Sequence, residues 1–104
     1  MYYILDDEKN PVKTDVDTWA KWYETKRTIG RVVRQDHING YFVSTVFLGL
    51  DHSFGKGEIP VLWETMIFEE GDWTDLYAKR YTSNYDALCG HLVALQVAEK
   101  GGLE

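Results

Sequence analysis

The side chains with the most chemical potential lie around two apolar segments in the middle of the chain. Asp51 and His52 follow the first segment, and Glu64 interrupts the second. An imidazole beside a carboxylate can act as a general base, because the carboxylate fixes the tautomer of the ring. The pattern therefore predicts a candidate catalytic site built on His52, with Asp51 or Glu64 as its partner.

His91 joins this candidate site if the C-terminal helix lies over the two apolar segments. Two His side chains and a carboxylate are enough for a catalytic type of zinc centre, so the candidate metal ligands are His52, Glu64 and His91. They lack the H-E-x-x-H spacing of zinc proteases. A simpler interpretation stays open, in which Asp51 and His52 bond the backbone of the loop that they begin. Glu64 then faces solvent beside Arg31.

Two hairpins must position these residues, and the first has a clear turn. Asn39-Gly40 supplies the positive φ angles of a two-residue turn. This predicts a hairpin between residues 29–38 and 41–50. In that register Val33 lies opposite Val46, so apolar side chains meet across the strands.

The second hairpin joins residues 42–50 to residues 61–68 through a glycine-rich loop. Setting Gly49 opposite Trp63 lets the indole ring cover the glycine. That register places Glu64 on the face of the sheet that His52 shares.

The other expected elements are a strand over 2–5, a helix over 15–26, a strand over 76–81 and a helix over 84–99. Thr14-x-x-Asp17 and Ser83-x-x-Asp86 have the spacing of a capping box at the start of each helix. The second helix carries an apolar stripe at helical spacing: Tyr85, Leu88, Leu92 and Leu95.

The order β-α-β-β-β-β-α predicts an α+β fold, an antiparallel β-sheet of about five strands with two helices packed on it. The length of 104 residues fits a single domain. We expect that domain to span residues 1–102, with 103–104 as a candidate remnant of a tag.

Composition limits the classes of function. A formal net charge of -6 disfavours direct binding to nucleic acid, because phosphates repel an acidic surface. An acidic protein can instead occupy the basic groove of a nucleic-acid-binding partner. The single Cys89 excludes an internal disulfide framework and favours the reducing cytoplasm. No apolar run reaches the ~20 residues that cross a bilayer, so no membrane contact is expected. No cofactor is expected either.

Trp22 and the loop over 53–60 supply the candidate binding residues. Trp22 falls off the apolar stripe of the first helix, and exposed Trp side chains often dominate binding interfaces. The loop adds Phe54, Lys56 and Glu58. It lacks the G-x-x-x-x-G-K-[ST] spacing of a phosphate-binding loop, which argues against a nucleotide as the ligand.

Several blocks carry a resemblance to a known family, and STVFLGLDH over 44–52 is the most specific of them. The others are MYYILDD over 1–7, WAKW over 19–22, WETMIF over 63–68, and Tyr81-Thr82 with Ala87-x-x-Gly90-His91. They are similar to short proteins encoded by phages and prophages, and the resemblance covers most of the chain. It implies a phage-associated protein in the host cytoplasm. It transfers no catalytic residue, because that family has no established activity.

These observations lead to one expected function and two alternatives. We expect a small accessory protein that binds a host or defence macromolecule, as an inhibitor or anti-defence protein, without catalysis. The first alternative is a small metal-dependent or acid–base enzyme that uses the candidate residues Asp51, His52, Glu64 and His91. The second is a structural virion component. A homodimer formed through an edge strand stays open.

Overall fold

The computed structural model describes residues 1–26, 30–53, 59–101 and 103. Over these residues it contains two helices and six strands in two antiparallel sheets, which confirms the α+β class. In chain order the elements are β1 (Tyr2–Leu5), β2 (Pro11–Thr14), α1 (Val16–Lys26), β3 (Val32–Ile38), β4 (Tyr41–Phe47), β5 (Trp63–Glu69), β6 (Asp75–Tyr81) and α2 (Asn84–Lys100). One sheet is the hairpin β1-β2, and the other has the order β3-β4-β5-β6.

The β3-β4 hairpin turns at the predicted place. Asn39 and Gly40 have φ angles of 51° and 80°, which satisfies the two-residue turn. At the far end the predicted register is wrong, because Val46 pairs with Val32 rather than Val33. A β-bulge there inserts one extra residue into β3 and shifts the pairing by one position.

The β4-β5 pairing differs from the predicted register by two residues. Phe47, not Gly49, lies opposite Trp63. Gly49 has a φ angle of +76°, and a Cβ atom there would lie 2.6 Å from Nε1 of Trp19. The aromatic ring that covers this glycine therefore comes from α1, and the carbonyl oxygen of Gly49 accepts the N–H of Tyr3 at 2.8 Å. Gly49 thus lies where the two sheets meet, and the absence of a side chain allows their close approach.

The β1-β2 hairpin contains a strand that the sequence pattern did not predict. Pro11 is the first residue of β2 and pairs with Leu5. A proline is tolerated at the start of a strand because no ladder bond needs its missing N–H. The helix that follows begins after Asp15 rather than Thr14, since Oδ1 of Asp15 accepts the N–H of Thr18 at 2.7 Å.

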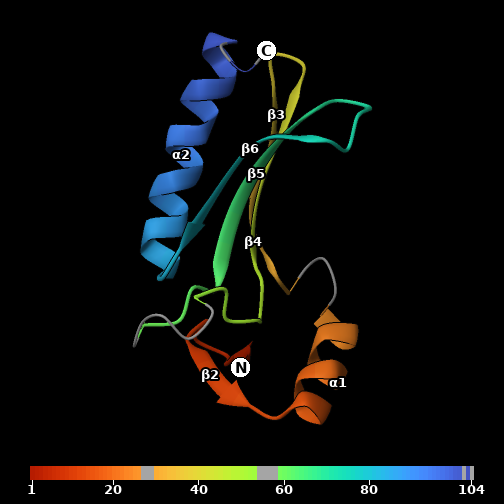
Figure 1. Ribbon diagram of the computed structural model, residues 1–104, viewed down its shortest axis with the longest axis vertical. Coiled ribbons are helices and arrows are strands. Elements are labelled where there is room, and N and C mark those ends of the chain that lie inside the picture. Colours follow the sequence, from red (N-terminus) through yellow and green to blue (C-terminus); the bar gives the residue numbers. More distant parts are fainter. Residues whose placement is uncertain (27–29, 54–58, 102, 104) are drawn as a thin grey trace.

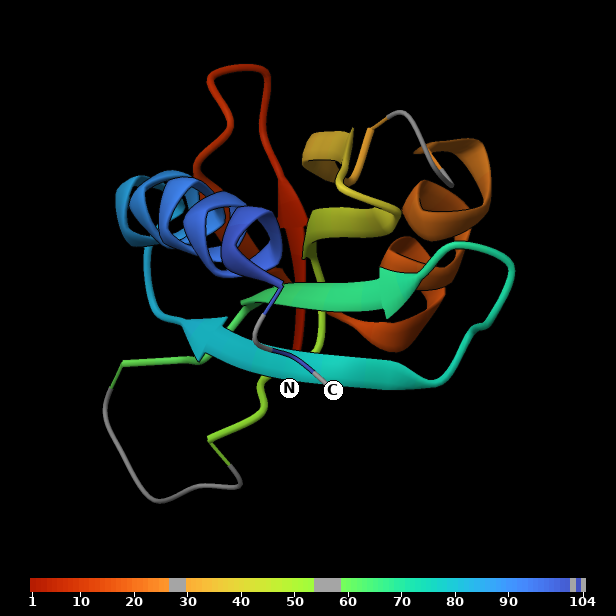
Figure 2. The same ribbon diagram turned by 90° about the horizontal axis from the view of Figure 1, so that it is seen from above.

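Helix α2 runs along one face of the four-stranded sheet, and the β1-β2 hairpin and α1 gather at the lower end (Figure 1). Seen from above, the turn between β5 and β6 lies far from α2 (Figure 2). The predicted cap is confirmed, because Oγ of Ser83 accepts the N–H of Asp86 at 3.0 Å. No described helix has the length and apolar character that crossing a membrane requires.

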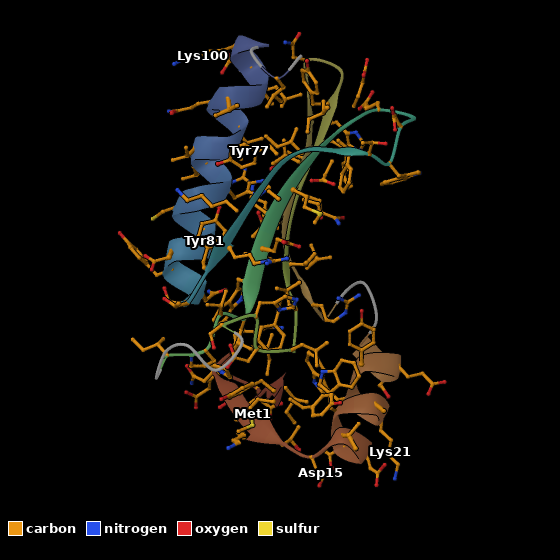
Figure 3. All side chains as sticks on the ribbon, in the orientation of Figure 1. Met1, Asp15, Lys21, Tyr77, Tyr81 and Lys100 are labelled. Atoms are coloured by element: carbon orange, nitrogen blue, oxygen red, sulfur yellow. The ribbon has the colours of Figure 1, made fainter. Side chains whose placement is uncertain are left out.

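The face of α2 that packs on the sheet is not the predicted leucine stripe. Its buried residues are mostly small: Ala87, Gly90, His91, Ala94 and Ala98. Tyr85, Leu88 and Leu92 instead point outward, with 74%, 40% and 51% of their surface exposed. A Cβ atom at Gly90 would overlap the ring of Tyr81, so the small residues allow a close approach to the sheet. Figure 3 shows the labelled Tyr77 and Tyr81 on the side of β6 that faces α2.

Two hydrophobic clusters fill the space between α2 and the sheet. The upper cluster consists of Tyr41, Val43, Ile67, Ala94 and Ala98. The lower cluster consists of Phe47, Leu62, Trp63, Tyr81 and Ala87. Leu103, at the predicted tag remnant, packs against the upper cluster.

Candidate functional site

Asp51 and His52 serve the loop backbone, as the simpler interpretation of the sequence held. Oδ1 of Asp51 accepts the N–H groups of Ser53 at 2.8 Å and Val61 at 3.0 Å. These two backbone bonds lower the pKa of the Asp51 carboxyl from its ordinary value. Nδ1 of His52 lies 2.8 Å from the carbonyl oxygen of Leu50. The Asp51 side chain therefore joins the two ends of the loop, and the His52 side chain bonds the backbone just before it.

Glu64 is buried on the face of the sheet opposite α2, where it pairs with a cation. Its Oε2 atom lies 2.8 Å from Nε of Arg80 on β6, and only 6% of the residue is exposed. The predicted neighbour Arg31 lies elsewhere, with its guanidinium 4.1 Å from the centroid of the Tyr23 ring. Glu64 therefore lies on the predicted face of the sheet, but it is buried there and its partner is Arg80 rather than Arg31.

His91 is fully buried and takes part in a chain of hydrogen bonds. Its Nε2 atom lies 2.7 Å from Oδ2 of Asp36, and its Nδ1 atom lies 2.7 Å from Oγ1 of Thr45. Thr45 also contacts the hydroxyl of Thr65, which accepts the O–H of Tyr81 at 3.1 Å. A carboxylate only accepts, so Nε2 carries a proton and Nδ1 can accept from Thr45. With a neutral His91 ring, the hydroxyls of Tyr81, Thr65 and Thr45 can all donate in one direction along the chain.

An aspartate, a histidine and a hydroxyl that are linked in this order by hydrogen bonds are also the parts of a nucleophilic catalytic triad. Here the hydroxyl of Thr45 and the ring of His91 have no exposed surface, so a substrate has no access to them. The chain of bonds lies between the upper and lower clusters, since Thr45 falls between Val43 and Phe47 on β4. It is best understood as a satisfied polar layer of the core.

The candidate metal ligands do not converge. Glu64 pairs with Arg80 on one face of the sheet, whereas His91 bonds Asp36 on the other. Among the described residues, no three His, Cys, Asp or Glu side chains gather closely enough to hold a metal ion. The expectation that His91 approaches Glu64 is therefore wrong, and His52, Glu64 and His91 do not form a metal-binding group.

Of the four predicted binding residues, Trp22 alone lies in the described part of the chain. Trp22 is half-buried in the lower cluster, with its ring edge-on to Phe47 at a centroid distance of 5.8 Å. It supports the core and does not stand free as an anchor. Phe54, Lys56 and Glu58 lie outside the described residues.

A second group of aromatic side chains lies on the face opposite α2, which we call the open face. Strand alternation places Phe42 and Phe68 there, paired directly across β4 and β5. Trp73, from the turn between β5 and β6, stands edge-on to both rings and is 76% exposed. The three rings line a pocket of about 440 Å³. We call Phe42, Phe68 and Trp73 the aromatic patch.

The rim of this pocket is acidic. Glu69 at the end of β5, the turn residues Glu70 and Asp72, and His37 are among its lining residues. Oε1 of Glu70 contacts Nδ1 of His37 at 2.5 Å, and the His37 ring lies 4.8 Å from the ring of Phe42. Oδ1 of Asp72 accepts the N–H of Thr74 at 2.9 Å, which lowers the pKa of that carboxyl.

The sequence does contain a signal for the aromatic patch. In β4 the buried positions Tyr41, Val43 and Phe47 alternate with positions that should be polar, and Phe42 occupies one of these. Trp73 lies in a turn of acidic and small residues, where no local packing explains a large ring. The comparisons add no relative, because no family model, curated protein or solved structure matches the chain. The similarity to short phage proteins stays a prediction.

Proposed function

We propose that this chain is a protein-binding module without catalytic activity and that the open face is its interface. The single observation that carries the proposal is the aromatic patch. Phe42 and Phe68 are half-buried and keep part of their surface exposed, and Trp73 is 76% exposed, which leaves apolar surface in water that folding alone does not require. Aromatic anchors with a polar rim are the usual anatomy of a protein interface.

The class of partner follows from the sequence. The resemblance to phage proteins favours a host or defence protein in the host cytoplasm, and the module would inhibit it by occupying a surface. The formal net charge of -6 favours a partner with a basic surface. The buried positions of Thr45 and His91 supply no support for the enzyme alternative.

Capture of partners from host lysate tests this proposal if matched variants are compared. Trp73→Ala removes the most exposed ring of the open face, and Leu92→Ala removes an exposed apolar side chain from the outer side of α2. We expect a partner that both the wild type and Leu92→Ala retain. Trp73→Ala should weaken its binding by roughly 30-fold, the effect of an interface hot spot.

Two results would contradict the proposal. One is a partner bound equally well by Trp73→Ala and by a Phe68→Ala variant, which would place the interface elsewhere. The other is recovery of the protein in purified virions with no partner in lysate, which would favour the structural role. Thermal melts of each variant establish that a loss of capture does not come from unfolding.

A further inference from the structure

We infer that the pocket beside Trp73 binds the guanidinium group of an arginine side chain on the partner protein. The inference rests on the proposed function and names the chemistry of its central contact. It follows from the arrangement of three aromatic rings and from the carboxylates at their rim.

The rings form a corner that suits a flat cation. Phe42 and Phe68 lie side by side, with centroids 6.5 Å apart and planes 24° from parallel. The Trp73 ring stands at 87° to Phe42 and 65° to Phe68, with centroids 6.2 Å and 5.5 Å away. The face of an aromatic ring is electron-rich and attracts a cation within ~6 Å of the centroid. A flat cation in this corner can therefore stack on the face of one ring and contact a second ring.

The rim supplies the opposite charge. The turn between β5 and β6 contributes the acidic residues Glu70 and Asp72 to the lining of the pocket. Asp72 is ionised at neutral pH, as an Asp carboxyl ordinarily is, and the N–H of Thr74 lowers its pKa further. Each carboxylate can accept several hydrogen bonds, so the bonds to Thr74 and His37 leave capacity for a ligand. An apolar side chain would leave this charge uncompensated.

Arginine fits these features better than lysine. Its guanidinium is planar, stacks on aromatic faces and donates paired N–H groups to carboxylates, whereas the lysine ammonium is a strongly hydrated point charge. The volume of about 440 Å³ falls within the range of sites that enclose a small ligand, so the pocket has room for a long side chain.

Blocked amino acids test the inference without a known partner. N-acetyl-arginine methylamide is titrated into the full chain and followed by two-dimensional NMR of backbone and indole N–H groups. The neutral control is N-acetyl-citrulline methylamide, which keeps the shape of arginine and lacks the charge. We expect the arginine probe to shift the indole N–H of Trp73 and the backbone of residues 69–73. The citrulline probe should bind about tenfold more weakly.

Variants separate the two parts of the site. Trp73→Ala should abolish the shifts over residues 69–73, Trp73→Phe should retain part of the affinity, and Asp72→Asn should weaken it severalfold. Leu92→Ala, on the outer side of α2, should bind like the wild type. Equal binding of the two probes, or shifts confined to another surface, would overturn the inference.

Failure of this inference is distinguishable from failure of the proposed function. If Trp73→Ala releases a captured partner while arginine and citrulline bind alike, the open face is the interface and the guanidinium contact is wrong. If arginine binds at Trp73 but the captured partner is indifferent to Trp73→Ala, the pocket exists and the proposed interface is wrong.

Discussion

The two faces of the four-stranded sheet use the same strands for opposite purposes. On the face under α2, Thr45 and Thr65 are fully buried and each hydroxyl has a partner. On the open face, Phe42 and Phe68 keep exposed surface beside Trp73. The group Asp36, His91 and Thr45 therefore stabilises the core, and the aromatic patch provides the candidate binding surface. Residue type alone does not assign a role, because burial decides which groups a ligand can reach.

The polar layer under α2 has a structural use. A buried hydroxyl or imidazole without a partner costs free energy, so the layer is stable only when its members align. A shift of one residue between β4 and β5 would turn Thr45 and Thr65 to opposite faces. We infer that the layer helps to fix the register of the central strands and the position of α2 along them.

The largest effect on stability is expected from His91→Ala. The change leaves Thr45 and Asp36 without their buried partner and opens a cavity, which should lower the free energy of unfolding by about 2–4 kcal/mol. Urea unfolding measures this value. The matched control is His37→Ala on the open face, where loss of an exposed ion pair should cost less than about 1 kcal/mol. Equal losses in the two variants would contradict the contrast between the faces.

A smaller loss is expected from Gly90→Ala. In most helices this change stabilises, but here the new Cβ atom overlaps the buried ring of Tyr81. We expect a loss of about 1–3 kcal/mol from overpacking. A double-mutant cycle with Tyr81→Ala checks the cause, because Gly90→Ala should cost little once the ring is absent. Additive losses would show that the close approach of α2 to β6 is not the reason.

Asp36 should make stability depend on pH. The hydrogen bond from His91 is the largest cause that lowers the pKa of Asp36 below its ordinary value of 3.8. A carboxyl whose pKa is lower in the folded than in the unfolded state stabilises the folded protein fully at pH values above its unfolded-state pKa. This contribution is lost as the pH falls through its folded-state pKa. Asp36→Asn should cost about 1–2 kcal/mol at neutral pH. In urea unfolding at several pH values, the difference from the wild type should narrow below about pH 4. A constant difference would contradict this.

The smallest effect on stability should come from Trp73→Ala. The ring is mostly exposed, and the main packing lost is its edge-on contact with Phe42 and Phe68. The free energy of unfolding should therefore fall by less than about 1 kcal/mol. The same variant should show the largest loss of partner binding. A destabilisation as large as that of His91→Ala would show that the aromatic patch serves the fold, and it would remove the contrast between the two faces.

Local chemistry explains which parts of the fold were predictable. The Asn39-Gly40 turn and the Ser83 cap were found because their geometry depends on a few neighbouring residues. Asp51 was also placed correctly, as a loop residue that bonds its own backbone. These features need no knowledge of the distant chain.

The features that were missed depend on contacts between distant elements. The partner of His91 is Asp36, which no spacing connects to it, because the position of α2 over the sheet decides the contact. The buried side of α2 was also mistaken, since hydrophobicity favoured Leu88 and Leu92 while the close approach at Gly90 required small residues. Trp73 is not predicted as a binding residue, because the turn that contains it consists mainly of acidic and small residues.

The exposure of Trp73 gives this protein a built-in optical reporter. Of its four tryptophans, Trp63 is 2% exposed, Trp19 and Trp22 are half-buried, and Trp73 is 76% exposed. The solvated indole should therefore dominate the long-wavelength side of the emission and the quenching by small solutes. A ligand that covers the aromatic patch should shift the spectrum to shorter wavelength. Occupancy of the open face can thus be followed by fluorescence without attaching a dye.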